Sequence, residues 1–212
     1  GNPSARAMQY HNAGIFLFQE GNYDLALSYF EEAHKTLSDY IPVSIYMAKI
    51  RMLKSEISEA QHLIDPLIQK HPYHSELNEI YCLILLKKNN LKNAELRAKN
   101  FLKNNISSTF PLPFLAESAR VKGNYRASVL YWQLYRNSFP IDPYANLALI
   151  ELYSDLNMDK ELDEELTKLL CLKKTLSLNS YINELSRNKN LLVYVPDYNK
   201  IQKIVKTRKT IH

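Results

Sequence analysis

Residues 10–38 read YHNAGIFLFQEGNYDLALSYFEEAHKTLS, and this stretch decides the fold. Two runs with apolar residues at helical spacing flank a Gly-Asn-Tyr turn at residues 21–23. Ala26 and Ala33 are seven residues apart and share one face of the second run. Gly and Asn are the residues that most easily adopt the left-handed backbone of a tight turn after a helix. The stretch therefore predicts a hairpin of two closely packed helices.

This hairpin pattern recurs every 34 residues along the chain. The small residue early in the second helix recurs as Ala26, Ala60, Ala94 and Ser128. In the same register, the small residue of the first helix recurs as Gly14, Ala48, Cys82 and Ala116. The turns begin at Gly21, Ser55, Asn89 and Gly123. Small residues let the two helices of a hairpin approach, and large ones such as Phe30 and Trp132 fill the space between hairpins.

The chain resembles the tetratricopeptide repeat family, whose unit is a 34-residue helix–turn–helix. The resemblance covers residues 7–174, as four units in constant register and a degenerate fifth. It implies an all-α, right-handed superhelical solenoid, because a single hairpin cannot bury its apolar face alone. The expected units are residues 7–40, 41–74, 75–108, 109–142 and 143–174, followed by a capping helix and basic tail at 175–212.

The C-terminal region does not follow the repeat. The apolar spacing from Leu178 to Leu185 predicts a helix that caps the last hairpin. The run LLVYV at residues 191–195 fits either a strand or an extended packing segment. Pro196 and Asp197 fit the start of a final helix.

The family resemblance implies that the first helix of each unit lines a concave groove for a segment of a partner protein. The partner-binding positions carried over are Met8, His11, Ile15, Phe18, Ile45, Lys49, Met52, Glu79, Leu83, Leu86, Glu117 and Arg120. The fifth unit adds Leu147 and Glu151. The apolar N-terminal part suits a peptide with aliphatic anchors, unless a preceding segment or a second copy of the chain covers it.

Three positions depart from patterns known in the family. His11 and Ile15 stand where chaperone-binding members carry Lys or Asn, so a clamp for a C-terminal carboxylate is not predicted. His11 could instead offer a hydrogen bond to a partner. Arg51 stands where the family has a large apolar residue. Its guanidinium is therefore either paired, or that helix face opens to solvent or to a partner.

No pattern of catalytic or metal-binding residues stands out. The chain has no Gly-rich phosphate loop, GxSxG or HExxH motif, so we predict no enzyme activity, no cofactor and no metal. His71 and His74 straddle Pro72, as in a solvated turn. The acidic residues of 159–165 are expected to face water at a helix N-terminus.

The cysteines and the lengths of the apolar runs indicate where in the cell the protein is located. Cys82 and Cys171 lie in apolar helical patterns and are predicted to be buried free thiols, which favours a cytoplasmic location. No apolar run reaches the roughly 18 residues that a membrane-spanning helix needs.

The function predicted from these features is that of a protein–protein interaction scaffold, adaptor or co-chaperone. Its partner would be another protein or a peptide segment, with self-association left open and a bacterial secretion or pilus assembly as an analogy. Residues 173–212 hold nine Lys or Arg against Glu184 and Asp197, within a net charge of +5. This basic end leaves an alternative, the regulatory or oligomerisation domain of a nucleic-acid-binding protein such as a transcription regulator.

Overall fold

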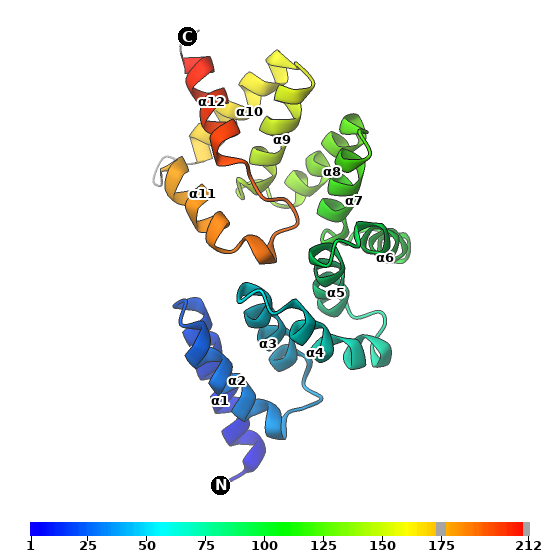
Figure 1. Ribbon diagram of the computed structural model, residues 1–212, viewed down its shortest axis with the longest axis vertical. Helices are drawn as coiled ribbons and strands as arrows, with labels where there is room; N and C mark the ends of the chain where they lie inside the picture. Colours follow the sequence, from blue (N-terminus) through cyan, green and yellow to red (C-terminus); the bar gives the residue numbers. More distant parts are fainter. Residues whose placement is uncertain (173–176, 210–212) are drawn as a thin grey trace. The chain divides into compact units, whose positions relative to one another are not determined.

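The computed structural model describes residues 1–172 and 177–209, and over this part of the chain it is all helical, with no strand (Figure 1). The all-α prediction is confirmed. The helices are α1 (Pro3–Gln19), α2 (Tyr23–Thr36), α3 (Ile41–Leu53), α4 (Ile57–Lys70), α5 (Ser75–Lys87), α6 (Leu91–Asn104), α7 (Pro111–Val121), α8 (Tyr125–Ser138), α9 (Tyr144–Asp155), α10 (Asp159–Leu172), α11 (Leu178–Arg187) and α12 (Tyr198–Lys209). A 3-10 turn, η1, spans Lys189–Leu191.

The chain divides into two compact units, residues 1–90 and 91–212. The first unit holds α1 to α5, and the second holds α6 to α12. The expected end of the fifth repeat at residue 174 and the last residues of the basic tail, 210–212, lie outside the described residues. No described helix combines the length and the apolar character needed to cross a bilayer.

The turn within each hairpin has the same backbone geometry in all five repeats. The left-handed residue of each turn has φ between 54° and 79° and recurs every 34 positions, at Gly21, Ser55, Asn89, Gly123 and Asn157. The next N–H donates to the carbonyl five residues earlier, as in the 2.9 Å bond from Asn22 to Leu17 and the 2.9 Å bond from Met158 to Tyr153. This is the Schellman termination of a helix. The fifth repeat is therefore in register at its turn, although its sequence matches the others weakly.

Small residues mark the places where two helices of a hairpin touch. A Cβ added at Gly14 would lie 2.8 Å from the ring of Phe30, so only glycine fits against this side chain. Ala26, Ala60 and Ala94 are fully buried. In the fourth repeat Ser128 takes this place, and its hydroxyl donates to the carbonyl of Ala116 at 2.8 Å. The predicted close approach is thus present in both units.

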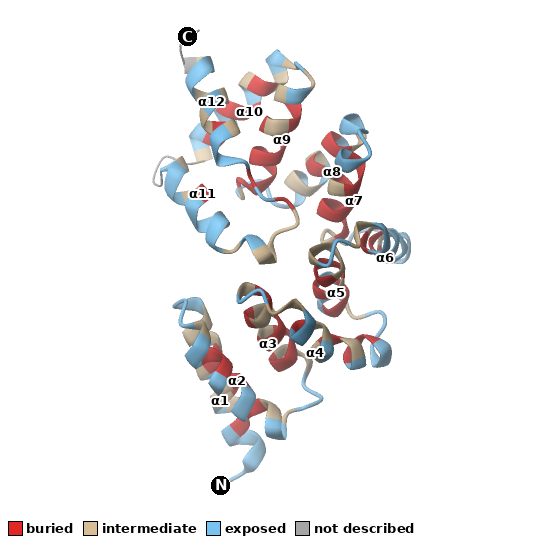
Figure 2. Cartoon of the chain, in the orientation of Figure 1, coloured by how far each residue is buried: buried red, intermediate tan, exposed pale blue. Residues whose placement is uncertain are grey.

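Large side chains fill the space between consecutive hairpins, as expected. In the first unit the ring of Phe30 on α2 stacks on that of Tyr46 on α3, with centroids 5.1 Å apart and planes within 10°. Figure 2 shows the buried residues on the sides of the helices that face their neighbours within each unit. In the second unit Trp132 is 2% exposed and lies in a core that extends to Ile182 of α11 and Ile201 of α12. Both C-terminal helices therefore cover the last hairpin.

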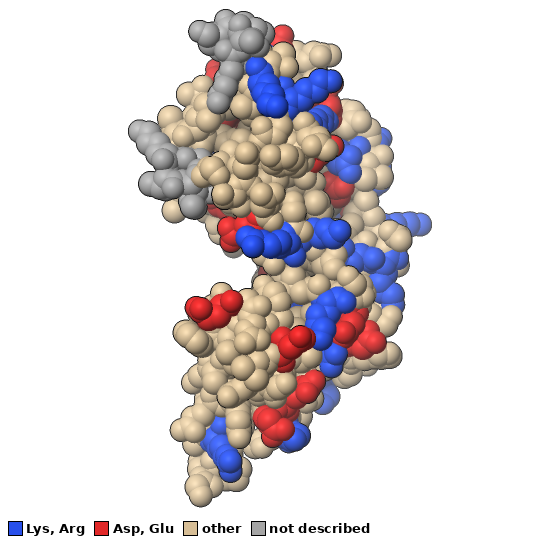
Figure 3. All heavy atoms as spheres, turned by 60° about the vertical axis from the view of Figure 1, so that its left-hand side comes forward, with Lys and Arg blue, Asp and Glu red and all other residues tan. Residues whose placement is uncertain are grey.

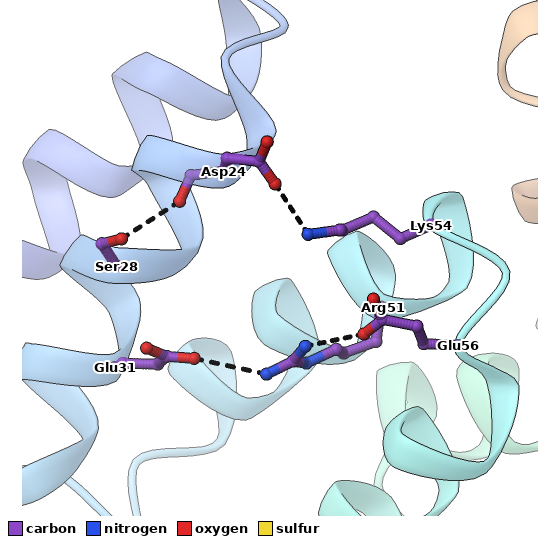
Figure 4. Close-up of polar contacts among 6 residues, drawn as sticks. All are labelled: Asp24, Ser28, Glu31, Arg51, Lys54 and Glu56. Carbon is purple, nitrogen blue, oxygen red and sulfur yellow. Dashed lines mark hydrogen bonds and ion pairs between the residues drawn. The ribbon is translucent and has the colours of Figure 1, made fainter.

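Arg51 is paired, which decides between the two alternatives left open by the sequence. Its guanidinium on α3 donates to Glu56 at 2.6 Å and to Glu31 of α2 at 3.3 Å (Figure 4). One turn away, Lys54 donates to Asp24 at 2.7 Å. Ion pairs this exposed contribute little stability, of the order of 0–1 kcal/mol each. Their effect is to fix the register of α2 against α3.

The two cysteines differ. Cys82 is buried, as predicted, but Cys171 is exposed, so the prediction for Cys171 was wrong. The apolar pattern LLCL places Leu169 in the core at 1% exposure. A helix has only one core-facing stripe, and Leu170 and Cys171 fall outside it.

Gly14→Ala tests the close helix contact. The added methyl group must displace the ring of Phe30, at a packing cost of about 1–3 kcal/mol that exceeds the gain of about 1 kcal/mol in helix propensity. We expect a lower free energy of unfolding by denaturant titration. Asn12→Ala, at an exposed position of the same helix, is the control. In Gly14→Ala/Phe30→Leu the smaller side chain should recover part of the loss. Unchanged stability of Gly14→Ala would contradict the contact.

Candidate functional site

The positions predicted to line a groove in the first unit divide by burial. His11, Ile45, Met52 and Leu83 are at most 6% exposed and belong to the interior. The partly exposed positions are Met8, Ile15, Phe18, Lys49 and Leu86, and Glu79 is exposed. The surface that these side chains offer to a partner is therefore smaller than the sequence predicts.

His11 sits among aromatic rings. The centroids of Phe30, Tyr40 and Tyr46 lie 5.6, 5.4 and 6.0 Å from its imidazole. Burial lowers the pKa of His11, so the ring is neutral near pH 7. Its Nδ1 is buried and has no hydrogen-bond partner in the described part of the chain. The imidazole thus acts as a packing element of α1 against the next hairpin.

Tyr46 links the accessible side chains of this region. Phe18 lies edge-on to Tyr46 and to Tyr23, with centroids 5.3 Å away in each case. The ammonium group of Lys49 lies 5.6 Å from the centroid of Tyr46. A positive charge beside an aromatic face is a favourable arrangement. This part of the surface is an aromatic patch with one cation.

In the second unit, Glu117, Arg120 and Glu151 lie around one cavity. They line a cavity of about 420 Å³ formed by α7, α9 and residues 193–200. Arg120 and Glu117 are paired at 2.5 Å. Leu147, the other position carried over in the fifth repeat, is fully buried. The first-helix face of this unit is therefore hollowed and carries both signs of charge.

The non-helical segment 192–197 lies on this face. The hydroxyl of Tyr144 on α9 accepts from the N–H of Tyr194 at 2.8 Å and donates to the carbonyl of the same residue at 2.5 Å. Burial raises the pKa of Tyr144 well above its usual range, so the hydroxyl keeps the proton that it donates. The Tyr194 ring packs edge-on against Trp132, with centroids 5.7 Å apart. One side chain thus binds both backbone polar groups of one residue.

Glu151 lies at the other end of the segment. Its carboxylate accepts from the N–H of Asp197 at 3.3 Å. Burial raises the pKa of Glu151 to about 7, although the Asp197 N–H and Lys200 both favour the charged form. Lys200 itself pairs with Asp155 at 2.6 Å. Glu151 therefore titrates near neutral pH within a site of mixed charge.

Sequence reasoning found Glu117, Arg120 and Glu151 but missed Tyr144 and Tyr194. The two tyrosines are fifty residues apart in the chain. Only the unassigned run at 191–195 signalled an unusual element, and its extended packing alternative is the one that the structure supports.

Comparison with known proteins agrees with the repeat fold. Residues 17–81 match the tetratricopeptide repeat family model. These residues carry tetratricopeptide repeats. A thermophilic repeat protein of Thermus thermophilus is similar, with a TM-score of 0.71 and 17% identity over 85% of this chain and 98% of that one. No curated protein sequence matches the chain.

Two further solved structures resemble this tetratricopeptide array. PilW, a type IV pilus biogenesis factor, matches with a TM-score of 0.71 and 14% identity over 87% of this chain and 86% of that one. A tetratricopeptide repeat protein from Parabacteroides merdae matches with a TM-score of 0.63 and 17% identity over 94% of this chain and 83% of that one. At such identities the likeness is one of fold. The predicted resemblance is confirmed.

The acidic run of α10 contains one buried carboxylate. Glu165 is 2% exposed, contacts Arg136 of α8, and accepts from the amide of Asn146 at 2.9 Å. The prediction that these acids face water was therefore wrong for Glu165. The cause is tertiary, because the partner charge comes from the preceding hairpin.

The basic end of the repeat protein is partly neutralised. Lys200 pairs with Asp155, and Arg208 pairs with Asp159 and, at 3.2 Å, with Asp163. Figure 3 shows acidic side chains interspersed with the basic ones around this end of the chain. These contacts reduce the charge left for phosphate groups.

Of the two histidines His71 and His74, one has a structural role. His74 caps α5, its Nδ1 accepting from the N–H of Leu77 at 3.3 Å. His71 lies exposed in the turn. Within residues 1–172 and 177–209 no three potential ligands gather as a metal site would require.

The pH dependence of stability tests the environment of Glu151. Because the folded state raises this pKa from 4.5 to about 7, it binds more protons than the unfolded chain between these pH values. The charged carboxylate therefore lowers stability above pH 7, by about 1–2 kcal/mol after allowing for partial exposure. Glu151→Gln should raise the free energy of unfolding at pH 8 relative to wild type more than at pH 5. Glu164→Gln, at an exposed position, is the control, and equal effects at both pH values would contradict the assignment.

Glu165→Ala tests the buried ion pair. Removing this carboxylate leaves the charge of Arg136 without its buried partner, and we expect the free energy of unfolding to fall by about 3 kcal/mol. Glu164→Ala changes the adjacent exposed acid and should stay within about 0.5 kcal/mol of wild type. Both are measured by denaturant titration. Similar values for the two variants would place Glu165 at the surface.

Proposed function

We propose that the protein is a non-catalytic scaffold that binds a segment of a partner protein on the first-helix face of its repeats. The observation that carries this proposal is the segment 192–197 on α9, where the hydroxyl of Tyr144 holds the backbone of Tyr194. This face can satisfy the polar groups of a polypeptide backbone. Backbone recognition gives affinity for a chain segment, and the surrounding side chains give specificity.

The charges of the cavity favour a polar or charged residue beside the bound segment. Arg120 keeps 45% of its side chain exposed although it pairs with Glu117. Its guanidinium has five N–H donors, more than one carboxylate uses. An acidic side chain or backbone carbonyl of a partner is therefore a suitable acceptor here. In the first unit, Phe18 and Lys49 offer aromatic and cationic contacts.

The cellular setting is proposed by analogy alone. PilW is described as a type IV pilus biogenesis factor, and a pilus or secretion assembly is the setting this likeness favours. The alternative, part of a nucleic-acid-binding regulator, has less support because Lys200 and Arg208 are engaged by acidic side chains.

Affinity capture with charge-reversal variants tests the proposal. The full chain is immobilised, and proteins retained from an extract of the source cells are identified by mass spectrometry. Arg120→Glu should reduce recovery of the specific partner about tenfold, as expected for one lost charge contact of about 1.4 kcal/mol. Arg126→Glu, an exposed arginine of α8 that does not line the cavity, should leave recovery unchanged. Equal recovery by both variants would overturn binding at this face.

A further inference from the structure

Three hydrogen bonds and the burial of Tyr194 and Pro196 hold the segment 192–197 on the repeat face. The two bonds to Tyr194 come from the side chain of Tyr144, and the bond to Asp197 comes from the side chain of Glu151. Val195 remains 42% exposed. A cavity of about 420 Å³ stays open between this segment, α7 and α9. The segment thus covers the face without filling it.

The aromatic ring of the segment fits its site except at one atom. Tyr194 is 7% exposed and lies among Trp132 and Tyr144, with centroids 5.7 Å from each. Its hydroxyl is buried and has no hydrogen-bond partner among residues 1–172 and 177–209. A buried hydroxyl without a partner loses its hydration with nothing in return. A phenyl ring would keep the same packing and avoid this loss.

We propose that residues 192–197 are a self-ligand of the second unit, and that a partner displaces them with a non-helical segment carrying phenylalanine at the position of Tyr194. The proposal rests on the proposed function and adds the chemistry of the partner and its competitor. The partner segment presents one N–H and one C=O to Tyr144. Its phenyl ring lies on Trp132, and its flanking residues are aliphatic like Val193 and Val195.

The buried hydroxyl of Tyr194 explains why a partner can displace the self-ligand. A segment of the same chain competes at an effective concentration in the millimolar range, which would exclude most partners if it fitted equally well. The buried hydroxyl weakens the internal contact and leaves room for a better ligand. Binding of a partner then depends on replacement of the Tyr194 ring by the phenyl ring of the partner.

Peptide binding to the full-length protein tests this proposal. A fluorescein-labelled peptide with the sequence of residues 190–199, NLLVYVPDYN, is compared by fluorescence anisotropy with its Tyr194→Phe form. The receptors are the wild type, Tyr194→Pro, which removes the N–H and ring of the self-ligand, and Tyr194→Pro/Tyr144→Phe, which also removes the binding hydroxyl.

The phenylalanine peptide should bind Tyr194→Pro at least about fivefold tighter than the tyrosine peptide does. This ratio corresponds to about 1 kcal/mol, the cost of burying a hydroxyl without a partner, which the phenylalanine peptide avoids. Both peptides should bind the wild type at least about tenfold more weakly than Tyr194→Pro. Binding should fall about tenfold when Tyr144→Phe is added. Equal affinity for the two peptides, or for wild type and Tyr194→Pro, would overturn the proposal.

Trp132 is the single tryptophan and reports the state of the site directly. Its emission should shift to longer wavelength in Tyr194→Pro and return on addition of the phenylalanine peptide. Circular dichroism checks that the variant folds, and Tyr194→Ala replaces it if it does not. A dimer of the wild-type chain that Tyr194→Pro abolishes would assign the site to a second copy and overturn the proposal. Capture that depends on Arg120 but is not increased by Tyr194→Pro would refute displacement and leave the scaffold function standing.

Discussion

The structure depends on one backbone constraint, the left-handed residue that closes each hairpin. At Gly21 and its four counterparts the chain reverses within a few residues, and the next N–H caps the helix that has just ended. Beside these turns the two helices of a hairpin approach closely, as at Gly14 against Phe30 and at Ser128 against Ala116. A Cβ added at Gly14 would lie 2.8 Å from the ring of Phe30. Close packing at these points leaves an apolar side on each hairpin, which a neighbouring hairpin covers or, after the last hairpin, α11 and α12 cover.

The periodic part of the fold could be predicted from the sequence because its causes are local. Turn chemistry at Gly21 and Asn89 and small residues at Ala26 and Ala60 act within one hairpin, so a 34-residue spacing reveals them. In the fifth repeat the backbone geometry of the turn is kept, but the side-chain pattern of the other repeats is not. Asn157 keeps the left-handed turn there although the small residues have gone.

The candidate site could be predicted only in part, because its main contacts join distant residues. Repeat register placed Glu117, Arg120 and Glu151 on one face, but nothing local relates Tyr144 to Tyr194. For the same reason, the burial of His11 and of Glu165 was not predicted from the sequence. His11 packs in an aromatic cluster formed with the next hairpin, and the buried Glu165 pairs with Arg136.

Occupation of a binding face by the chain's own segment changes what the measured affinity of a partner means. The apparent affinity is the intrinsic affinity reduced by the fraction of molecules in which the face is open. An internal segment that fits perfectly would keep that fraction very small, whereas one with an unsatisfied hydroxyl such as that of Tyr194 keeps it larger. The same segment shields Trp132 and the apolar part of the face from water when no partner is present. A slightly imperfect self-ligand thus meets two opposing demands, protection of an apolar surface and access for a partner, through the choice of one aromatic residue.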